Sequence, residues 1–166
     1  MQRIAITLFL LLAFSPTVAA NIVWPALYAE TRVSSLPIIA LSLLLEWLVI
    51  RWLFRMDWKR SAAYALAANL ASGVLGLLFR PLLGIAWDLS LGQLVIFLFN
   101  WGTFNPIAWF FVPVIGGAVN ASIELLTIRL IWKQAFTRKR FLVLWLANWL
   151  TVGMATIWVV ASPPAF

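Results

Sequence analysis

Two glutamates and two asparagines interrupt long apolar stretches of this sequence. Glu46 and Asn69 lie in the first half of the chain, and Glu124 and Asn148 lie in the second half. A carboxylate at the centre of a bilayer costs at least about 2.5 kcal/mol on insertion scales, so such residues usually mark functional positions. Two carboxyl groups at one depth could share a proton. Amide and hydroxyl oxygens beside them would complete a site for a hard cation or a polar solute.

These polar residues recur in the same order in both halves. Asparagine follows glutamate by 23 residues in the first half and by 24 in the second, and a serine or threonine follows each asparagine by three. Rare polar residues at matched spacing predict an internal duplication of a helical hairpin, with both copies in one orientation. Asn120 shares a helical face with Glu124, four residues away. The predicted intramembrane polar site consists of Glu46, Asn69, Ser72, Asn120, Glu124, Asn148 and Thr151.

Helix geometry places the glutamates and asparagines at a similar depth. Each lies eight or nine residues from a basic cluster, or about 13 Å at a rise of about 1.5 Å per residue. We therefore expect them to face the interior of a four-helix bundle near the bilayer centre. A structural interpretation carries equal weight, because a Glu–Asn hydrogen bond between helices is worth roughly 0.6–2 kcal/mol by itself. The two interpretations differ in whether a Glu→Gln substitution is tolerated.

The elements that must position these groups follow from composition. The chain has 166 residues, of which 64% are hydrophobic and 10% charged, and its mean hydropathy is +1.01. Soluble domains carry about 25% charged residues, and a small domain cannot hide this much apolar surface from water. The sequence predicts an all-α integral membrane protein. Four apolar runs are long enough to span a bilayer: about 36–54, 61–79, 107–132 and 141–160.

The predicted organisation is one membrane domain after an export signal. Residues 1–20 resemble a cleaved signal peptide, with an uncleaved first helix as the alternative. Residues 21–166 then form a single membrane domain, with the first repeat at about 36–79 and the second at about 107–160. The connecting segment 80–106 is too short to cross twice, so we expect an interfacial or re-entrant element on the outer face.

Basic residues predict the orientation. One cluster follows the first predicted span and another follows the third, and short basic loops are typically cytoplasmic. We therefore expect a multi-pass protein of the bacterial inner membrane, with the mature N-terminus and the C-terminus outside; a eukaryotic secretory membrane is the alternative. These loops are short and close to the membrane, so no nucleic-acid partner is expected. The two basic loops contain Arg55, Lys59, Arg60, Lys133, Arg138, Lys139 and Arg140.

The residues that are missing limit the possible chemistry. The sequence has no cysteine and no histidine, which excludes disulfides, thiolate chemistry and imidazole catalysis. No catalytic group, metal site or cofactor is predicted. The favoured hypothesis is a transporter or channel that uses the duplicated Glu/Asn site for a cation, a proton or a small polar solute. The alternative is an accessory or assembly subunit of a larger membrane complex, and a lipid-acting enzyme is less favoured. The expected partners are the lipid bilayer and either further copies of the chain or a larger complex.

Overall fold

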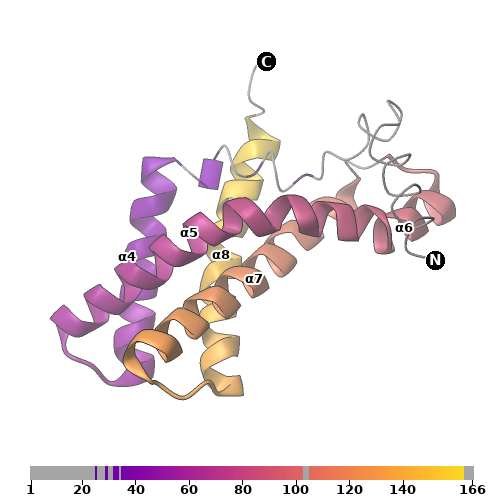
Figure 1. The fold of residues 1–166 in the computed structure, drawn as a ribbon. Helices are drawn as coiled ribbons and strands as arrows, with labels where there is room; N and C mark the ends of the chain where they lie inside the picture. The colour runs from indigo at the N-terminus through magenta and orange to yellow at the C-terminus, as the bar shows by residue number, and fades with distance from the viewer. Residues whose placement is uncertain (1–24, 26–28, 30–31, 34, 103–104, 163–166) are drawn as a thin grey trace, which may run out of the picture.

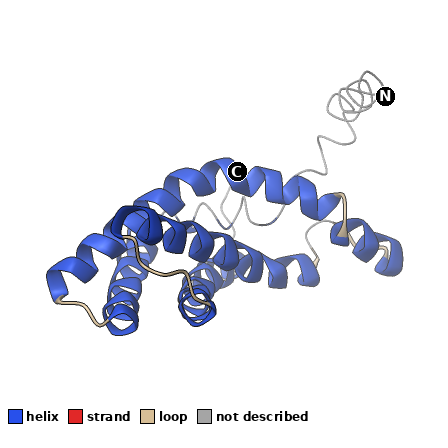
Figure 2. Cartoon of the chain, turned by 60° about the horizontal axis from the view of Figure 1, so that its bottom comes forward, coloured by secondary structure: helices blue, strands red, loops and turns tan. Residues whose placement is uncertain are grey.

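A computed structural model describes residues 25, 29, 32–33, 35–102 and 105–162. The predicted signal peptide lies outside the described residues. In the described part the chain is helical, without strands (Figure 2). The helices are α4 (Leu36–Phe54), α5 (Trp58–Asp88), α6 (Leu91–Phe99), α7 (Pro106–Trp132) and α8 (Arg138–Ala161).

Local signals explain where the long helices begin and end. Asp57, Asn105 and Thr137 precede α5, α7 and α8, and each accepts a hydrogen bond from the backbone N–H three residues later. Such caps satisfy donors that the first helical turn leaves open. Helices α4 and α7 end on Arg55 and Lys133, which adopt left-handed conformations with φ of 52° and 54°. A short loop leads from α4 into α5, and another leads from α7 into α8. We call α4–α5 the first hairpin and α7–α8 the second hairpin.

In the described part of the chain, four helices are long and apolar enough to cross a membrane, and the bent pair Pro81–Asp88 and Leu91–Phe99 makes a fifth candidate if it forms one span. The four long helices coincide within a few residues with the four predicted spans, which the structure thereby supports as candidates. The second differs at its far end, because α5 continues through Pro81 to Asp88 before a bend of 44° leads into α6. The predicted connecting segment therefore begins as an extension of α5. A proline removes one helical hydrogen bond, but an apolar environment penalises the open backbone groups that a broken helix would leave.

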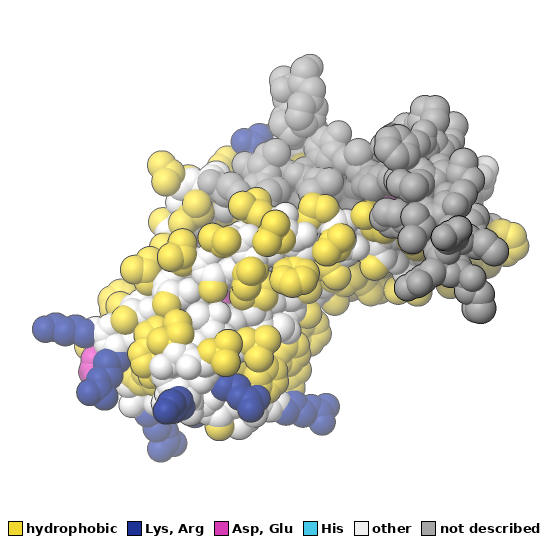
Figure 3. All heavy atoms as spheres, viewed as in Figure 1, with side chains coloured by type: hydrophobic (Ala, Val, Ile, Leu, Met, Phe, Trp, Pro, Cys, Tyr) yellow, Lys and Arg dark blue, Asp and Glu magenta, His cyan; other side chains and the backbone are white. Residues whose placement is uncertain are grey.

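The four long helices form a bundle in which each packs against two others. Helix α4 contacts α5 and α8, and α7 contacts the same two helices. In Figure 1, α4 and α8 stand upright, α5 and α7 slant across them, and both hairpin loops lie at the bottom. Most of the Lys and Arg side chains gather around this end, and apolar side chains cover the middle of the surface (Figure 3). We call the end with the two loops the basic end.

Two apolar clusters occupy the interior. The cluster nearer the basic end joins all four long helices and includes Ile50, Leu125 and Leu144. Tyr64 of α5 stacks on Trp132 of α7 beside it, with ring centroids 3.9 Å apart. The second cluster lies toward the opposite end and consists of Ala29, Trp87, Ala108, Val112 and Val152. The polar residues predicted from the sequence lie between these clusters along the helices.

Candidate functional site

Glu46 lies in the interior of the bundle and is bound by two side-chain donors. Its residue surface is fully buried. The hydroxyl of Ser42, one turn earlier on α4, donates to Oε1 at 2.8 Å. The Nδ2 amide of Asn69, from α5, donates to Oε2. This carboxyl group therefore joins α4 to α5, and both of its oxygens accept a hydrogen bond.

Glu124 has a related but incomplete environment. It is fully buried on α7, and Nδ2 of Asn148 on α8 donates to its Oε2 at 2.9 Å. Its other oxygen, Oε1, is buried and has no hydrogen-bond partner among the described residues. Ser72 of α5 lies close to this carboxyl group, but the Ser72 hydroxyl donates to the backbone carbonyl of Asn69 at 3.1 Å. One acceptor position on Glu124 is therefore open.

The two carboxyl groups are near enough to interact electrostatically, and neither forms an ion pair with a basic side chain that the structure describes. Among the described residues, the only ion pair joins Arg60 to Asp57 at 3.4 Å, on the exposed surface of the basic end. Arg51, five residues after Glu46, instead places its guanidinium over the Trp58 ring at 3.7 Å. The described structure thus offers the buried carboxyl pair no compensating positive charge.

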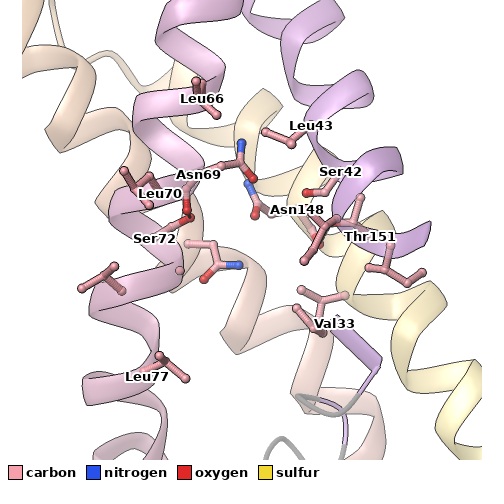
Figure 4. Close-up of a pocket in the computed structure, with 16 residues that line it drawn as sticks. Val33, Ser42, Leu43, Leu66, Asn69, Leu70, Ser72, Leu77, Asn148 and Thr151 are labelled. Carbon is pink, nitrogen blue, oxygen red and sulfur yellow. Dashed lines mark hydrogen bonds between the residues drawn. The ribbon is translucent and has the colours of Figure 1, made fainter. Parts of the chain in front are cut away.

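A cavity of about 420 Å³ adjoins this cluster on the side away from the basic end. Its walls come mainly from α4 and α5 and are apolar, with Leu43, Leu66, Leu70 and Leu77 among the labelled side chains in Figure 4. Its polar lining comes from all four long helices and is called the polar floor here. The polar floor consists of Ser42, Asn69, Ser72, Asn120, Asn148 and Thr151.

Most hydrogen-bond donors of the polar floor are already engaged. The Nδ2 groups of Asn69 and Asn148 each donate twice, once to a glutamate and once to the backbone carbonyl four residues earlier. The hydroxyls of Ser42, Ser72 and Thr151 donate to Glu46 or to backbone carbonyls. What these five side chains still offer to the cavity is oxygen lone pairs.

The structure brings the seven predicted polar residues together. Five of them line the cavity, and Glu46 and Glu124 lie behind the polar floor, where they accept its hydrogen bonds. Ser42 was not predicted, although its position four residues before Glu46 on the same helical face was an available signal. The predicted basic residues surround the other end of the bundle, away from the cavity.

The exposed end of the bundle has separate electrostatics. The backbone N–H of Arg60 donates to Asp57 at 2.9 Å, and this bond holds the pKa of Asp57 below its ordinary value. Within the described ranges, no group of three or more His, Cys, Asp and Glu side chains could hold a metal ion.

Comparisons with protein families, curated proteins and solved structures found no match to this chain.

Proposed function

We propose that this protein is a small multi-pass membrane transporter that binds a proton or a cation at the Glu46–Glu124 pair. The observation that carries this proposal is the burial of two interacting carboxyl groups without a basic partner in the described structure. An uncompensated buried charge costs several kcal/mol (roughly 3–5 when one partner of a buried pair is removed). A bound proton or cation removes this cost, and the open Oε1 of Glu124 provides a place for it.

An internal duplication supports a paired site. The bonded Glu and Asn residues are separated by 23 positions in one hairpin and by 24 in the other. Among the four long helices, exchanging α4 with α7 and α5 with α8 leaves the set of helix contacts unchanged. We propose that the hairpins are parallel copies related by a pseudo-two-fold axis along the membrane normal. Such an axis brings one carboxyl from each copy toward the middle of the bundle.

The proposed orientation gives the site an outer access route. Following the rule that basic loops stay inside, the basic end is cytoplasmic and the bilayer is a bacterial inner membrane, with residues 1–20 as the export signal. The cavity then opens from the carboxyl level toward the outer side. Toward the cytoplasm, the cluster around Ile50, Leu125 and the Tyr64–Trp132 stack closes the bundle. Exchange with the cytoplasm therefore requires these helices to move apart.

An accessory role is the second candidate, and an apolar groove on α7 and α8 favours it. This groove has a volume of about 610 Å³, and Trp109, Phe110, Trp149 and Ile157 contribute to its lining. Its surface suits a transmembrane helix of a partner or of a second copy. A lipid-acting enzyme is a weaker candidate, because it would have to use carboxyl, amide and hydroxyl groups alone.

Flux measurements in proteoliposomes test the transporter proposal. The purified protein is reconstituted with an internal pH dye, and H⁺ movement is followed after imposed H⁺, Na⁺ or K⁺ gradients. We expect flux above that of protein-free liposomes and its loss in Glu46→Gln and Glu124→Gln, because glutamine keeps the shape but binds no proton. Asp57→Asn, which removes an exposed carboxylate at the basic end, is the matched control and should retain flux.

Two results would overturn the proposal. One is wild-type flux equal to that of empty liposomes, and the other is full flux in both glutamine variants, which would leave the Glu–Asn bonds as structural contacts. Native mass spectrometry after mild-detergent purification addresses the accessory role. Recovery in fixed stoichiometry with another membrane protein would favour that role, whereas recovery alone or as a homo-oligomer is expected for the transporter.

A further inference from the structure

We propose that the cavity between α4 and α5 binds an amphipathic organic cation, whose ammonium head lies on the polar floor and whose apolar body lies along the α4 and α5 walls. This inference rests on the proposed function in one respect, because the Glu46–Glu124 pair supplies the negative charge. It adds the class of substrate and the direction from which the substrate enters.

The polar floor selects a head group that donates hydrogen bonds. The side-chain hydrogens of five of its members are engaged, so these members present oxygen lone pairs. The sixth, Asn120, is only 8% exposed, and its Oδ1 accepts no hydrogen bond from the part of the chain that the structure describes. A buried polar atom left open costs about 1–3 kcal/mol. An ammonium group with N–H donors satisfies these acceptors and also neutralises the carboxylates behind them.

The walls select an apolar body. The cavity volume of about 420 Å³ is many times the roughly 30 Å³ that a water molecule takes in the liquid. A proton or a bare metal ion would therefore fill little of the cavity. Ile38, Ile39 and Leu43 on α4 face the cavity, as do Leu66 and Leu70 on α5. Water would gain few hydrogen bonds from these side chains, whereas an alkyl or aryl group gains burial of about 25 cal/mol per Å².

The rim of the cavity connects it to the hydrocarbon region. Leu66 and Leu70 line the cavity and are also 62% and 67% exposed on the surface of the bundle. These leucines are on a helix whose length and composition suit a membrane span. A ligand body lying between α4 and α5 would therefore contact lipid along this rim. Entry from the bilayer follows, and it suits a molecule that partitions into membranes.

A difference between the hairpins explains why α4 and α5 leave space at this level, whereas α7 and α8 are in close contact at Gly117. In the second hairpin, Gly117 lies seven residues before Glu124, and a methyl group there would lie 2.9 Å from the backbone nitrogen of Trp149. In the first hairpin, Ile39 takes the position of Gly117, and Leu70 takes the position of Trp149. Both Ile39 and Leu70 line the cavity. A glycine lets α7 and α8 approach closely, whereas two bulky residues hold α4 and α5 apart.

Binding of decylammonium tests the ligand class. The protein in lipid nanodiscs is titrated with decylammonium chloride by calorimetry, and empty nanodiscs correct for partitioning. Decanol, decanoate and decyltrimethylammonium match the chain but lack the charge, reverse it or lack N–H donors, respectively. We expect saturable binding of decylammonium and binding of each analogue weaker by about tenfold or more, as the loss of a hydrogen bond to a charged group implies.

Substitutions at two glycines locate the binding. Gly73 lines the cavity, and an added Cβ there meets nothing within 4 Å, so we expect Gly73→Leu to fill part of the cavity and weaken decylammonium binding by about tenfold or more. Gly153→Leu is the matched control, because it adds the same volume on α8 beside the other groove, with only Pro113 at 3.9 Å. Asn120→Leu, which removes the open acceptor, should weaken binding to a similar extent.

The outcomes separate this inference from the proposed function. Equal saturable binding of decylammonium and decanol, or unchanged binding in a folded Gly73→Leu protein, would overturn the amphipathic-cation site. If glutamate-dependent H⁺ flux is observed but decylammonium does not bind, the transporter proposal stands and this inference fails. If decylammonium binds and Gly73→Leu blocks it while flux is absent, the site stands and the transport proposal fails.

Discussion

Replacing Gly117 by alanine should separate α7 from α8. Gly117 lies against the backbone of α8 at Trp149, where an added methyl group would lie 2.9 Å from the backbone nitrogen and 3.1 Å from Cα. The carbonyl carbon of Asn148 would be 3.4 Å away. All three atoms belong to the backbone, so no side-chain rotation can relieve the contact. Helix α8 must shift as a unit, and it carries Asn148 away from Glu124.

The size of the effect follows from a matched comparison. Glycine to alanine inside a helix contributes about 0.5–1 kcal/mol of stability, and overpacking a close contact costs typically about 1–3 kcal/mol. The methyl group added by the neighbouring substitution Gly116→Ala meets only Cγ1 of Val152, at an ordinary 3.7 Å. Gly116→Ala therefore gains the helix-propensity contribution without the cost of overpacking. The helix-propensity contribution cancels between the two variants. Gly117→Ala should therefore be less stable than Gly116→Ala by about 1–3 kcal/mol.

Unfolding in mixed micelles measures this difference. Titration with a denaturing detergent, followed by far-ultraviolet circular dichroism, gives the free energy of unfolding for both variants. Infrared absorption of the carboxyl C=O stretch supplies a second readout, since displacement of α8 should change the 2.9 Å bond from Asn148 to Glu124. Equal stability of the two alanine variants would refute the close approach at Gly117, and so would a Glu124 signal unchanged in Gly117→Ala.

Two further predictions concern the donors around acidic residues. Asn148→Leu should destabilise the protein more than Asn69→Leu by about 1–3 kcal/mol. Without Asn69, Glu46 keeps its hydrogen bond from Ser42, whereas without Asn148, Glu124 loses its only hydrogen bond among those described. Detergent unfolding of both variants measures the order of stability, and the reverse order would contradict this prediction. At the basic end, the pKa of Asp57 is lowered mainly by the backbone N–H of Arg60, so its contribution to stability is present above the ordinary carboxyl pKa and is lost as the pH falls through the lowered value. Asp57→Asn should remove this acid-dependent part of the unfolding curve, and an unchanged pH profile would show that the cap contributes nothing measurable.

The membrane helices were predictable because apolar run length directly reflects bilayer thickness. The predicted span 36–54 coincides with α4, and α7 begins one residue before the predicted 107–132 and ends with it. Helices α5 and α8 each begin three residues before the predicted span, at their basic ends. Caps account for those differences, since Asp57 and Thr137 start α5 and α8 before the apolar runs begin. The continuation of α5 past Pro81 was not predicted, because a proline normally signals a helix end in a sequence.

The contacts of the polar cluster were predictable only in part. Rare polar residues in a composition this apolar stand out individually, and matched spacing paired each glutamate with its asparagine, as the hydrogen bonds of Glu46 and Glu124 now show. The cavity could not be predicted in the same way. It depends on how closely two helices approach, and that distance depends on side-chain volumes at positions such as Ile39 and Gly117. A small residue such as Gly117 beside a polar stripe indicates a close approach, but the sequence does not show which backbone it meets or where a bulky residue such as Ile39 leaves space.

A second difference between the hairpins concerns the hydrogen bonds of the two carboxyl groups. The sequence repeats glutamate and asparagine in both hairpins but does not repeat Ser42, so both oxygens of Glu46 accept a hydrogen bond while Oε1 of Glu124 accepts none. An incoming proton or ammonium group competes with two existing donors at Glu46 and with one at Glu124. The two hairpins thus provide one carboxyl group that accepts hydrogen bonds at both oxygens and one with an open acceptor among the described residues. Under the proposed function, Glu124 is the primary site of exchange and Glu46 adjusts its affinity through the electrostatic interaction between them.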